Sequence, residues 1–300
     1  MILTVTPNPA LDITYQVDHL KRGVSFRVTP LAEAGGKGLN VARVLAALGN
    51  EVSATGPLGG ANGLRVRELL EKTAVVPKFI ASQVPTRQTI NVVDDSDATI
   101  FNEAGLPQTE ELWERLSHVI LAARAKVVTI CGSFPPHTAP GTLTKLLAAA
   151  RSAGSNTVVD TSGQALVAAA QAGADLLKPN EVELAEATGE NALQAGATRL
   201  LGLGAKAVVC SRGAAGLSAF TPSLQVNVPP GVRLHGNPTG AGDSLVASLA
   251  ASLAKTGEIP TSKPELTSWL NRASALAAAT VAAPTAGAFD QALYQKLLEE

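Results

Sequence analysis

The sequence predicts an α/β sandwich, in which a mostly parallel sheet is covered by helices on both faces. From about residue 105 onward, short β-branched runs alternate with longer segments rich in alanine and leucine. This alternation is typical of βαβ units, whose strands lie parallel. The composition agrees, because a chain of 300 residues that is 46% hydrophobic and 16% charged can bury a large core.

The expected elements of this sheet follow a regular order. We expect strands over residues 126–130, 156–160, 175–177 and 205–210, with helices over 139–154 and 163–173. Ligands of such sheets bind at the carboxyl ends of the strands. Polar residues follow these ends, as in Lys178-Pro179-Asn180 and Ser211-Arg212-Gly213, so we expect the functional site at this edge.

Two stretches of the N-terminal third break the alternation. Residues 11–31 and 86–101 show no helical period, and the second has β-rich runs on either side of Asp94-Asp95-Ser96-Asp97, which indicates a hairpin. We therefore expect a small antiparallel sheet that serves as a lid or a dimer surface. The chain has no Pro/Ser linker, so we expect one domain over 1–300, with a core over about 1–10, 34–84 and 104–300 and a lid over about 11–33 and 85–103.

A glycine-rich turn opens a helix near Leu39. The turn is Gly35-Gly36-Lys37-Gly38, and apolar residues at helical spacing indicate a helix that stops at Gly49. The N-terminus of a helix carries unpaired N–H groups and a partial positive charge, which suit an anion. With Lys37, this turn predicts a site for a phosphate or for sugar hydroxyls, although a flexible loop with a solvated lysine fits the pattern as well.

A second turn of this kind is Asn237-Pro238-Thr239-Gly240-Ala241-Gly242-Asp243, which precedes the apolar run 244–254. A carboxylate beside a bound phosphate would repel it, so Asp243 is better suited to accept a proton from a nucleophile that attacks the phosphate. A capping or first-turn aspartate after a glycine-rich loop explains the same residues. The motif alone does not separate these two interpretations.

Two charged residues of the N-terminal third are further candidates. Asp12 follows an expected strand and the turn Pro7-Asn8-Pro9, where its carboxylate can accept hydrogen bonds from vicinal hydroxyls or from its own backbone. Arg87 begins the expected hairpin and is either an anion clamp or an isolated surface arginine.

Two further motifs follow strands in the second half of the chain. Asn180 and Glu183 are oxygen ligands three residues apart on one helix face, which suits Mg²⁺ bound largely through water. The same spacing is that of a capping box, and both interpretations can hold. Residues 211–216, Ser-Arg-Gly-Ala-Ala-Gly, either contact nucleotide phosphates or form the turn before a hairpin near 217–228.

Charge and composition exclude several functions. A net charge of −1 and a pI near 6.4 provide no basic surface for nucleic acid or an anionic membrane. The longest apolar stretch, 273–283, is too short to span a bilayer, so we expect a cytoplasmic protein whose Cys131 and Cys210 are buried thiols. The four histidines lack metal-ligand spacing, and neither a Walker motif nor the protein-kinase motif set is present.

Taken together, the motifs carry a family resemblance. Residues 35–43, 132–136, 178–183 and 240–243 resemble the PfkB, or ribokinase-like, carbohydrate kinases. More narrowly, residues 4–12, 59–63 and 159–163 are similar to the branch of 1-phosphofructokinases and tagatose-6-phosphate kinases. The match runs from residue 3 to about 287. It implies a ribokinase-like three-layer α/β/α sandwich, closed by a small β-sheet lid that often pairs two subunits into a homodimer.

The resemblance also implies an activity and a set of site residues. The activity is ATP-dependent, Mg²⁺-dependent phosphorylation of a hexose phosphate, with fructose 1-phosphate as the first candidate and tagatose 6-phosphate, fructose 6-phosphate or an unphosphorylated hexose as alternatives. Asp243 would be the general base, and Gly240, Ala241 and Gly242 would donate N–H groups to the transferring phosphoryl group. The sugar would be bound by Asp12, Gly36, Lys37 and Asn40, and its phosphate by Lys37 and Arg87, with Arg27 and Ser133 as further candidates. The Mg²⁺ would be bound by Asn180 and Glu183. The nucleotide would be bound by Lys178, Asn180, Ser211, Gly213 and Gly216, together with Gly240 and Gly242.

Among several departures from the family pattern, one concerns the implied sugar site, and one other class of function is also open. His137 stands after Pro135-Pro136, where the family commonly has glycine, at the rim of the implied sugar site. A non-catalytic sugar-phosphate sensor could retain the same fold, because fold does not fix function. The joint presence of Asp243, Glu183 and Lys37 favours an enzyme, since a sensor has no use for a general base.

Overall fold

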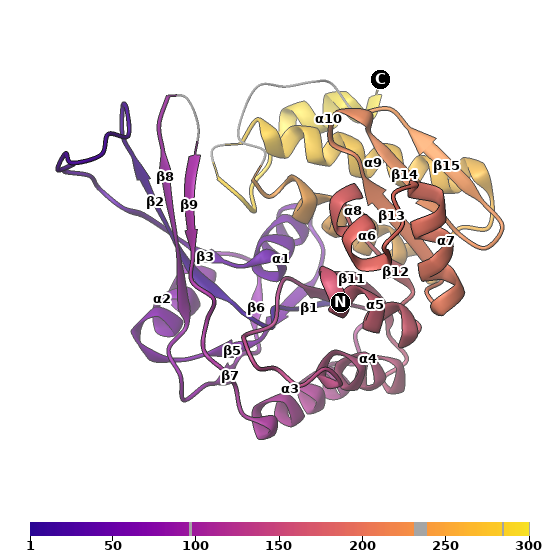
Figure 1. Ribbon diagram of the computed structural model, residues 1–300, viewed down its shortest axis with the longest axis horizontal. Helices are drawn as coiled ribbons and strands as arrows, with labels where there is room; N and C mark the ends of the chain where they lie inside the picture. Colours follow the sequence, from indigo (N-terminus) through magenta and orange to yellow (C-terminus); the bar gives the residue numbers. More distant parts are fainter. Residues whose placement is uncertain (96–97, 231–238, 284, 300) are drawn as a thin grey trace.

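A nine-stranded sheet forms the centre of the protein (Figure 1). The computed structural model describes residues 1–95, 98–230, 239–283 and 285–299. The strands from β13 to β6 are parallel, and β14 and β15 add an antiparallel edge, which confirms the predicted mostly parallel sheet. In sheet order the strands are β15 (Gln225–Val228), β14 (Leu217–Phe220), β13 (Ala207–Ser211), β12 (Leu176–Leu177), β11 (Asn156–Asp160), β10 (Val127–Cys131), β1 (Ile2–Val5), β4 (Val52–Thr55) and β6 (Val76–Pro77).

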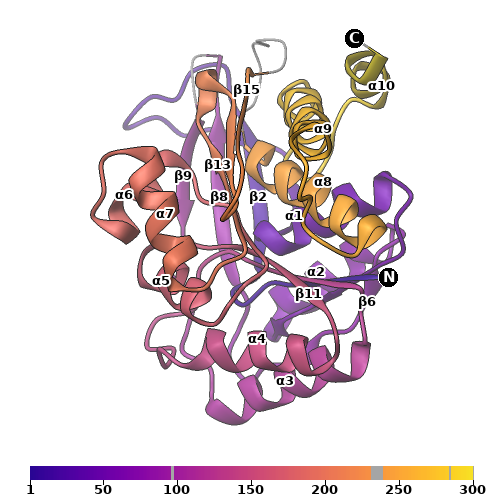
Figure 2. The same cartoon turned by 90° about the vertical axis from the view of Figure 1, so that its right-hand side faces the viewer.

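Helices cover both faces of this sheet, as Figure 2 shows with the sheet between them. Successive strand residues point to opposite faces, so Ile2 packs in one core cluster and Leu3 in the other. The expected three-layer α/β/α sandwich is therefore confirmed. One face carries α1 (Lys37–Ala47), α2 (Gly60–Leu70), α8 (Ala241–Thr256), α9 (Lys263–Val281) and α10 (Gln291–Glu299); the other carries α3 (Glu110–Ala123), α4 (Thr142–Ser152), α5 (Gly163–Gln171), α6 (Glu181–Thr188) and α7 (Leu193–Leu203).

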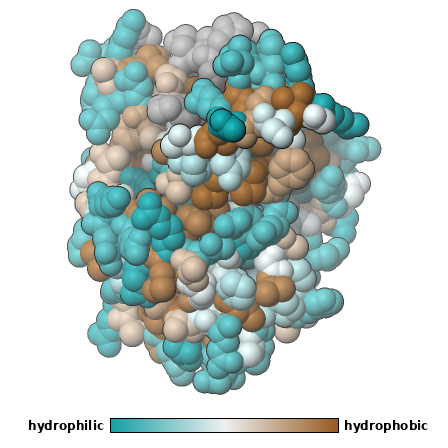
Figure 3. Space-filling view, turned by 90° about the vertical axis from the view of Figure 1, so that its left-hand side faces the viewer, coloured by the Kyte–Doolittle hydropathy of each residue, from teal (hydrophilic) through white to brown (hydrophobic). Residues whose placement is uncertain are grey.

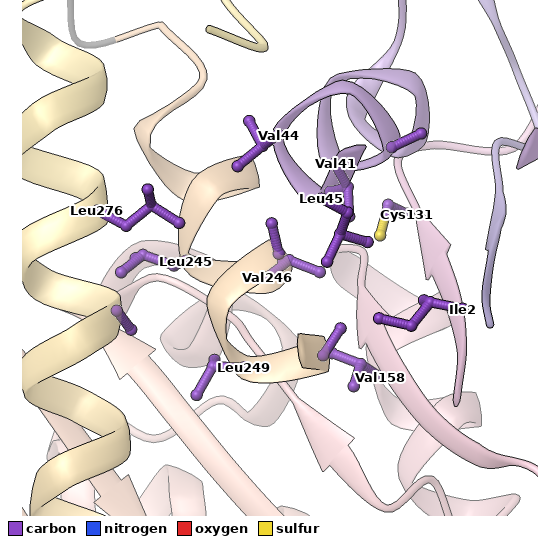
Figure 4. Packing of buried hydrophobic residues seen from close by; sticks show 14 of the residues in the cluster. Ile2, Val41, Val44, Leu45, Cys131, Val158, Leu245, Val246, Leu249 and Leu276 are labelled. Carbon is purple, nitrogen blue, oxygen red and sulfur yellow. The ribbon is translucent and has the colours of Figure 1, made fainter. Parts of the chain in front are cut away.

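The packing of α1 against α8 fixes the position of the two glycine-rich turns. Figure 4 shows Val41, Val44 and Leu45 of α1 facing the apolar side chains of α8, among them Val246. These α1 residues are fully buried, as their helical spacing predicted. Helix α1 begins at Lys37, earlier than expected, because Gly36 adopts φ +102 and ends the preceding strand there.

A separate sheet of four strands projects from the core (Figure 1), and we refer to it as the lid sheet. Its order is β3 (Leu31–Gly35), β2 (Ala10–Gln16), β8 (Arg87–Val93) and β9 (Ala98–Asn102). The hairpin β8–β9 is antiparallel, as predicted. The expectation of a wholly antiparallel sheet is wrong, because β2 and β8 pair in parallel. The core segments between these two strands supply the long crossover that a parallel pair needs.

Smaller elements complete the described residues. Strands β5 (Pro57–Leu58) and β7 (Ile80–Ala81) form a two-stranded parallel sheet, and a 3₁₀ turn, η1, spans Gly213–Ala215 before the hairpin β14–β15. Cys131 and Cys210 are buried free thiols, as expected, and burial raises the pKa of both. Among the helices of the described residues, none combines the length and the hydropathy that a transmembrane span requires.

Candidate active site

Two lysines and two aspartates meet at the carboxyl end of the parallel strands. Asp160, the last residue of β11, is fully buried. Its Oδ1 accepts a hydrogen bond from Lys37 Nζ at 3.3 Å, and the same Nζ lies 3.2 Å from its Oδ2. Lys178 Nζ lies 3.5 Å from Asp160 Oδ1. Asp160 ends a strand at the expected site but was assigned no role from the sequence, whereas the family resemblance assigned Lys178 to the nucleotide.

Asp243 lies in the first turn of α8 and is only 6% exposed. Its Oδ2 accepts a hydrogen bond from Asn40 Nδ2 at 2.8 Å, which joins the first turn of α8 to the first turn of α1. The capping residue of α8 is Gly240, which makes no side-chain cap. Of the two positions that the sequence left open, Asp243 thus has the one in the first turn, and its carboxylate does not cap the helix.

Burial sets the ionisation of this carboxylate. Burial first, and then the charge of Asp160, raise the pKa of Asp243, and the hydrogen bond from Asn40 and the charges of Lys37 and Lys178 oppose the rise; the resulting pKa is about 7. Burial lowers the pKa of Lys37, but the carboxylates around it, Asp160 first, outweigh burial and raise that pKa above its ordinary value. The site thus holds a carboxyl group whose pKa is about 7 beside Lys37, whose ammonium group stays charged, a pattern typical of acid–base sites.

The residues Gly240-Ala241-Gly242, which we call the anion loop, present backbone donors. Gly240 adopts φ +88, and the first helical bond of α8 runs from Ser244 N to Gly240 O. The preceding N–H groups of the first turn have no partner within the helix. A β-carbon on Gly242 would lie 3.6 Å from Lys178 Nζ, so the lysine adds a cation to these donors. Asn237 and Pro238 of the same motif lie outside the described residues.

On the lid side, Asp12 of β2 packs against Gly35 at the end of β3. A β-carbon on Gly35 would lie 2.0 Å from Asp12 Cγ, so only glycine leaves room for this carboxylate. Burial raises the pKa of Asp12, whereas the Thr89 hydroxyl and the charge of Arg87 lower it. Arg87 donates from Nε to Asn8 O at 3.2 Å and from Nη1 to Glu103 O at 3.2 Å. Arg87 is thus not an isolated surface side chain, and it shares its surroundings with Asp12.

Asn180 and Glu183 form the capping box that their spacing allowed. Asn180 Oδ1 accepts from Glu183 N at 2.8 Å, and Glu183 Oε2 accepts from Asn180 N at 2.9 Å. The other carboxylate oxygen, Glu183 Oε1, lies 3.8 Å from Lys37 Nζ. The described residues contain no group of three His, Cys, Asp or Glu side chains that could hold a metal ion. This donor set suits Mg²⁺ bound through water and phosphate oxygens, and does not suit an all-protein cage.

The other candidate residues lie at different distances from this cluster. Ser211 ends β13, and its backbone pairs with that of Asn180 in an isolated parallel β-bridge. No atom lies within 4 Å of the β-carbon position of Gly213, so the space beside it is open. A β-carbon on Gly216 would lie 2.1 Å from Val228 O, so Gly216 is required by the hairpin turn. Ser133 is exposed and follows Gly132, whose β-carbon position lies 3.8 Å from Lys37 Cβ. The structure does not bring Arg27 to the cluster: it lies in the exposed segment between β2 and β3.

Two residues gain significance only from the structure. Arg43, which is not among the predicted site residues, donates to Asn40 Oδ1 at 2.8 Å, and Asn40 in turn donates to Asp243. His137 adopts φ +60, the left-handed region that favours glycine. The backbone at position 137 thus keeps the conformation expected of a glycine, although histidine occupies it.

The chain is similar to known proteins over most of its length. The profile of the pfkB family carbohydrate kinases matches residues 11–292. A tagatose-6-phosphate kinase of Staphylococcus epidermidis is 33% identical over 84% of this chain and 85% of its own length, and a 1-phosphofructokinase of Xanthomonas campestris pv. campestris is 34% identical over 84% and 83%. Phosphofructokinase-2 from Escherichia coli, solved in complex with fructose-6-phosphate, superposes with a TM-score of 0.89 at 29% identity, over 99% of this chain and 98% of that chain.

Proposed function

We propose that this chain, which belongs to the pfkB family of carbohydrate kinases and is a phosphotransferase, phosphorylates a hexose phosphate with ATP. The proposed acceptor is fructose 1-phosphate, and the proposed product is fructose 1,6-bisphosphate. The observation that carries the proposal is the buried Asp243 carboxyl, whose pKa is about 7, next to the anion loop. A group that ionises near neutral pH and lies beside phosphate donors suits the removal of a proton from an attacking hydroxyl.

In this proposal each residue performs a simple physical task. ATP, when bound, supplies the phosphoryl group that is transferred. The N–H groups of the anion loop, together with Lys178, face the charge that develops on that group, and Lys37 adds a second cation held by Asp160. Glu183 would contact Mg²⁺ through water. Asp243 Oδ2 is held by Asn40, so Oδ1 is left to accept the proton of the sugar hydroxyl.

The acceptor is the part of the proposal that the relatives leave most open, because they include a tagatose-6-phosphate kinase and a 1-phosphofructokinase. A coupled assay of ADP release over a panel of hexoses and hexose phosphates tests it. We expect the highest kcat/KM with fructose 1-phosphate. A higher value with tagatose 6-phosphate or fructose 6-phosphate would replace the acceptor, and no ADP release on the whole panel would refute the proposed function.

Arg87→Ala is expected to raise KM for the hexose phosphate by roughly 10- to 100-fold, the scale of a lost charge-assisted hydrogen bond, with a smaller change in kcat. The physical reason is that Arg87 is the cation next to Asp12 on the lid side of the site. Steady-state kinetics with the phosphorylated acceptor and its unphosphorylated parent sugar measure the effect. An equal change in kcat/KM for both sugars would contradict a phosphate contact, and Arg65→Ala, which removes an exposed arginine paired with Glu68, is the control.

We further propose that the lid, over about 11–33 and 85–103, pairs two copies of the chain. Every residue of β9 is exposed, and Figure 3, which views the lid side, shows hydrophobic side chains gathered among hydrophilic ones. An exposed edge strand with large apolar side chains favours pairing with another chain. The exposed apolar residues of the lid are Leu20, Val24, Phe26, Val28, Leu31, Ile100 and Phe101.

Phe101→Asp is therefore expected to convert a dimer into a monomer, as measured by light scattering coupled to size exclusion. Phe101 is 60% exposed, and a carboxylate in an apolar interface would be left without a partner. Leu64→Asp is the matched control, because Leu64 is 65% exposed but lies on α2, outside the lid. A wild-type protein that is monomeric at micromolar concentration, or a Phe101→Asp dimer, would refute pairing through the lid.

A further inference from the structure

Arg43 joins three separate segments of the chain. It lies on α1, one turn after Asn40, with a side chain that is only 13% exposed. Its Nη1 donates to Glu33 Oε1 of β3 at 3.0 Å, and its Nη2 donates to Asn40 Oδ1 at 2.8 Å. The same Nη2 donates to Ala286 O at 2.7 Å, in the segment between α9 and α10. A partly buried cation with one carboxylate and two amide oxygens as partners has a fixed position.

This contact determines which way the Asn40 amide faces. An asparagine amide has an acceptor end and a donor end. Because Arg43 donates to Oδ1, the NH₂ end faces the opposite way and donates to Asp243 Oδ2. In the flipped orientation, the NH₂ group would face the guanidinium, and Oδ1 would face the carboxylate of Asp243. Both contacts would then be repulsive, so Arg43 selects the orientation in which Asn40 supports Asp243.

Arg43 also contacts the residues behind the anion loop. A β-carbon on Gly287 would lie 2.6 Å from Arg43 Nη2, and a β-carbon on Gly240 would lie 3.0 Å from Ala286 Cα. The segment at Ala286 and Gly287 is thus held between the guanidinium and the first residue of the anion loop. Glu33 places the other side of the guanidinium against the lid sheet.

We propose that Arg43 is a positioning residue that acts through Asn40: it holds the amide in the orientation that donates to Asp243, and it ties the lid strand β3 to the segment that backs the anion loop. The inference rests on the proposed function, in which Asp243 accepts the proton of the sugar hydroxyl. Arg43 itself touches neither that hydroxyl nor the phosphoryl group in this assignment.

The test compares Arg43→Gln and Arg43→Lys in the full-length enzyme. Displacement of a general base by up to about 1 Å lowers the rate of proton transfer. We therefore expect kcat of Arg43→Gln to fall by roughly 10- to 100-fold, with KM for ATP within about twofold of the wild-type value. The low-pH limb of the kcat/KM profile should move to higher pH, because Asn40 no longer stabilises the charged carboxylate. Arg43→Lys keeps one donor and one charge, and should recover part of the rate.

A double-mutant cycle with Asn40→Ala separates positioning from a general loss of structure. If Arg43 acts through Asn40, Arg43→Gln should have little further effect on kcat in the Asn40→Ala background. Additive effects of the two substitutions, or an unmoved low-pH limb in Arg43→Gln, would overturn the proposal. Arg65→Gln is the matched control, because Arg65 makes a 2.9 Å ion pair with Glu68 on the exposed face of α2, and it should leave all these quantities unchanged.

The same assays distinguish failure of this inference from failure of the proposed function. An inactive Asp243→Asn together with a wild-type-like Arg43→Gln would refute only the positioning role. A fully active Asp243→Asn would refute the general base, and with it the premise of the cycle. Circular dichroism and thermal unfolding of each variant identify a substitution that prevents folding, and Arg43→Lys then carries the comparison, because it keeps the charge opposite Glu33.

Discussion

Replacement of Asp243 by asparagine is expected to lower kcat by ~10²-fold or more while ATP binding is retained. The amide keeps the shape of the carboxyl group and can still accept the hydrogen bond from Asn40, so the two helix N-termini should stay joined. It cannot take a proton from the acceptor hydroxyl. Single-turnover kinetics and a nucleotide-binding titration measure the two quantities, and a rate near that of the wild type would refute the role of the base.

The same substitution should stabilise the protein at high pH. The pKa of Asp243 is raised to about 7 in the folded state from an ordinary value of 3.8, so the folded state binds this proton more tightly than the unfolded state does. Its contribution to stability is fully present below pH 3.8 and is lost as the pH rises through about 7. We therefore expect Asp243→Asn to raise the free energy of unfolding at pH 8 by up to about 4 kcal/mol.

Thermal unfolding at two pH values checks this expectation. The difference between Asp243→Asn and the wild type should be larger at pH 8 than at pH 5. An equal difference at both values would contradict the raised pKa. In the wild type, kcat/KM should fall about tenfold per unit of pH below the pKa of Asp243, since only the charged form accepts a proton.

Asp160→Asn is expected to have the second-largest effect, a loss of about 3–5 kcal/mol in the free energy of unfolding. Asp160 is fully buried between Lys37 and Lys178, and the side chain of Lys178 is only 4% exposed. Removal of the carboxylate leaves two ammonium groups without their shared partner. It also removes a charge that raises the pKa of Asp243, so the low-pH limb of kcat/KM should move to lower pH.

Asp175→Asn provides a matched control for Asp160→Asn. Asp175 is also buried and also has a lysine partner, Lys206. It precedes β12, however, and so lies at the amino ends of the parallel strands, opposite the candidate site. Urea unfolding should report a loss of stability for both variants. Only Asp160→Asn should move the pH profile and raise KM for ATP, and a pH profile that stays in place would contradict the electrostatic link between Asp160 and Asp243.

Local patterns predicted the parts of the protein that local physics determines. The strands β10 and β11, the helix α1 and the hairpin β8–β9 each have a period or a turn signal within a dozen residues. The capping box of Asn180 and Glu183 was likewise visible, because its two members lie three residues apart.

Partnerships between distant segments were not accessible in this way. Asp160 acquires its role only where Lys37 and Lys178 meet it, and Lys37 and Asp160 are 123 positions apart in the sequence, so no local signal indicates that contact. The parallel pairing of β2 with β8 depends on how the intervening core folds. Arg43 lay within a motif that the sequence analysis recognised, but its partners on β3 and at Ala286 come from two other segments.

The junction between the lid sheet and α1 has a consequence for the choice of acceptor. Strand β3 ends at Gly35 and α1 begins at Lys37, so a single residue separates them. A β-carbon on Gly36 would lie 3.0 Å from Thr6 Cγ2, so the junction packs closely against the residue that follows β1. In the proposed function, a sugar that contacts the lid strands would also contact the first turn of α1. Water is too small to contact both, so we expect this short connection to favour transfer to the sugar over hydrolysis of the phosphate donor.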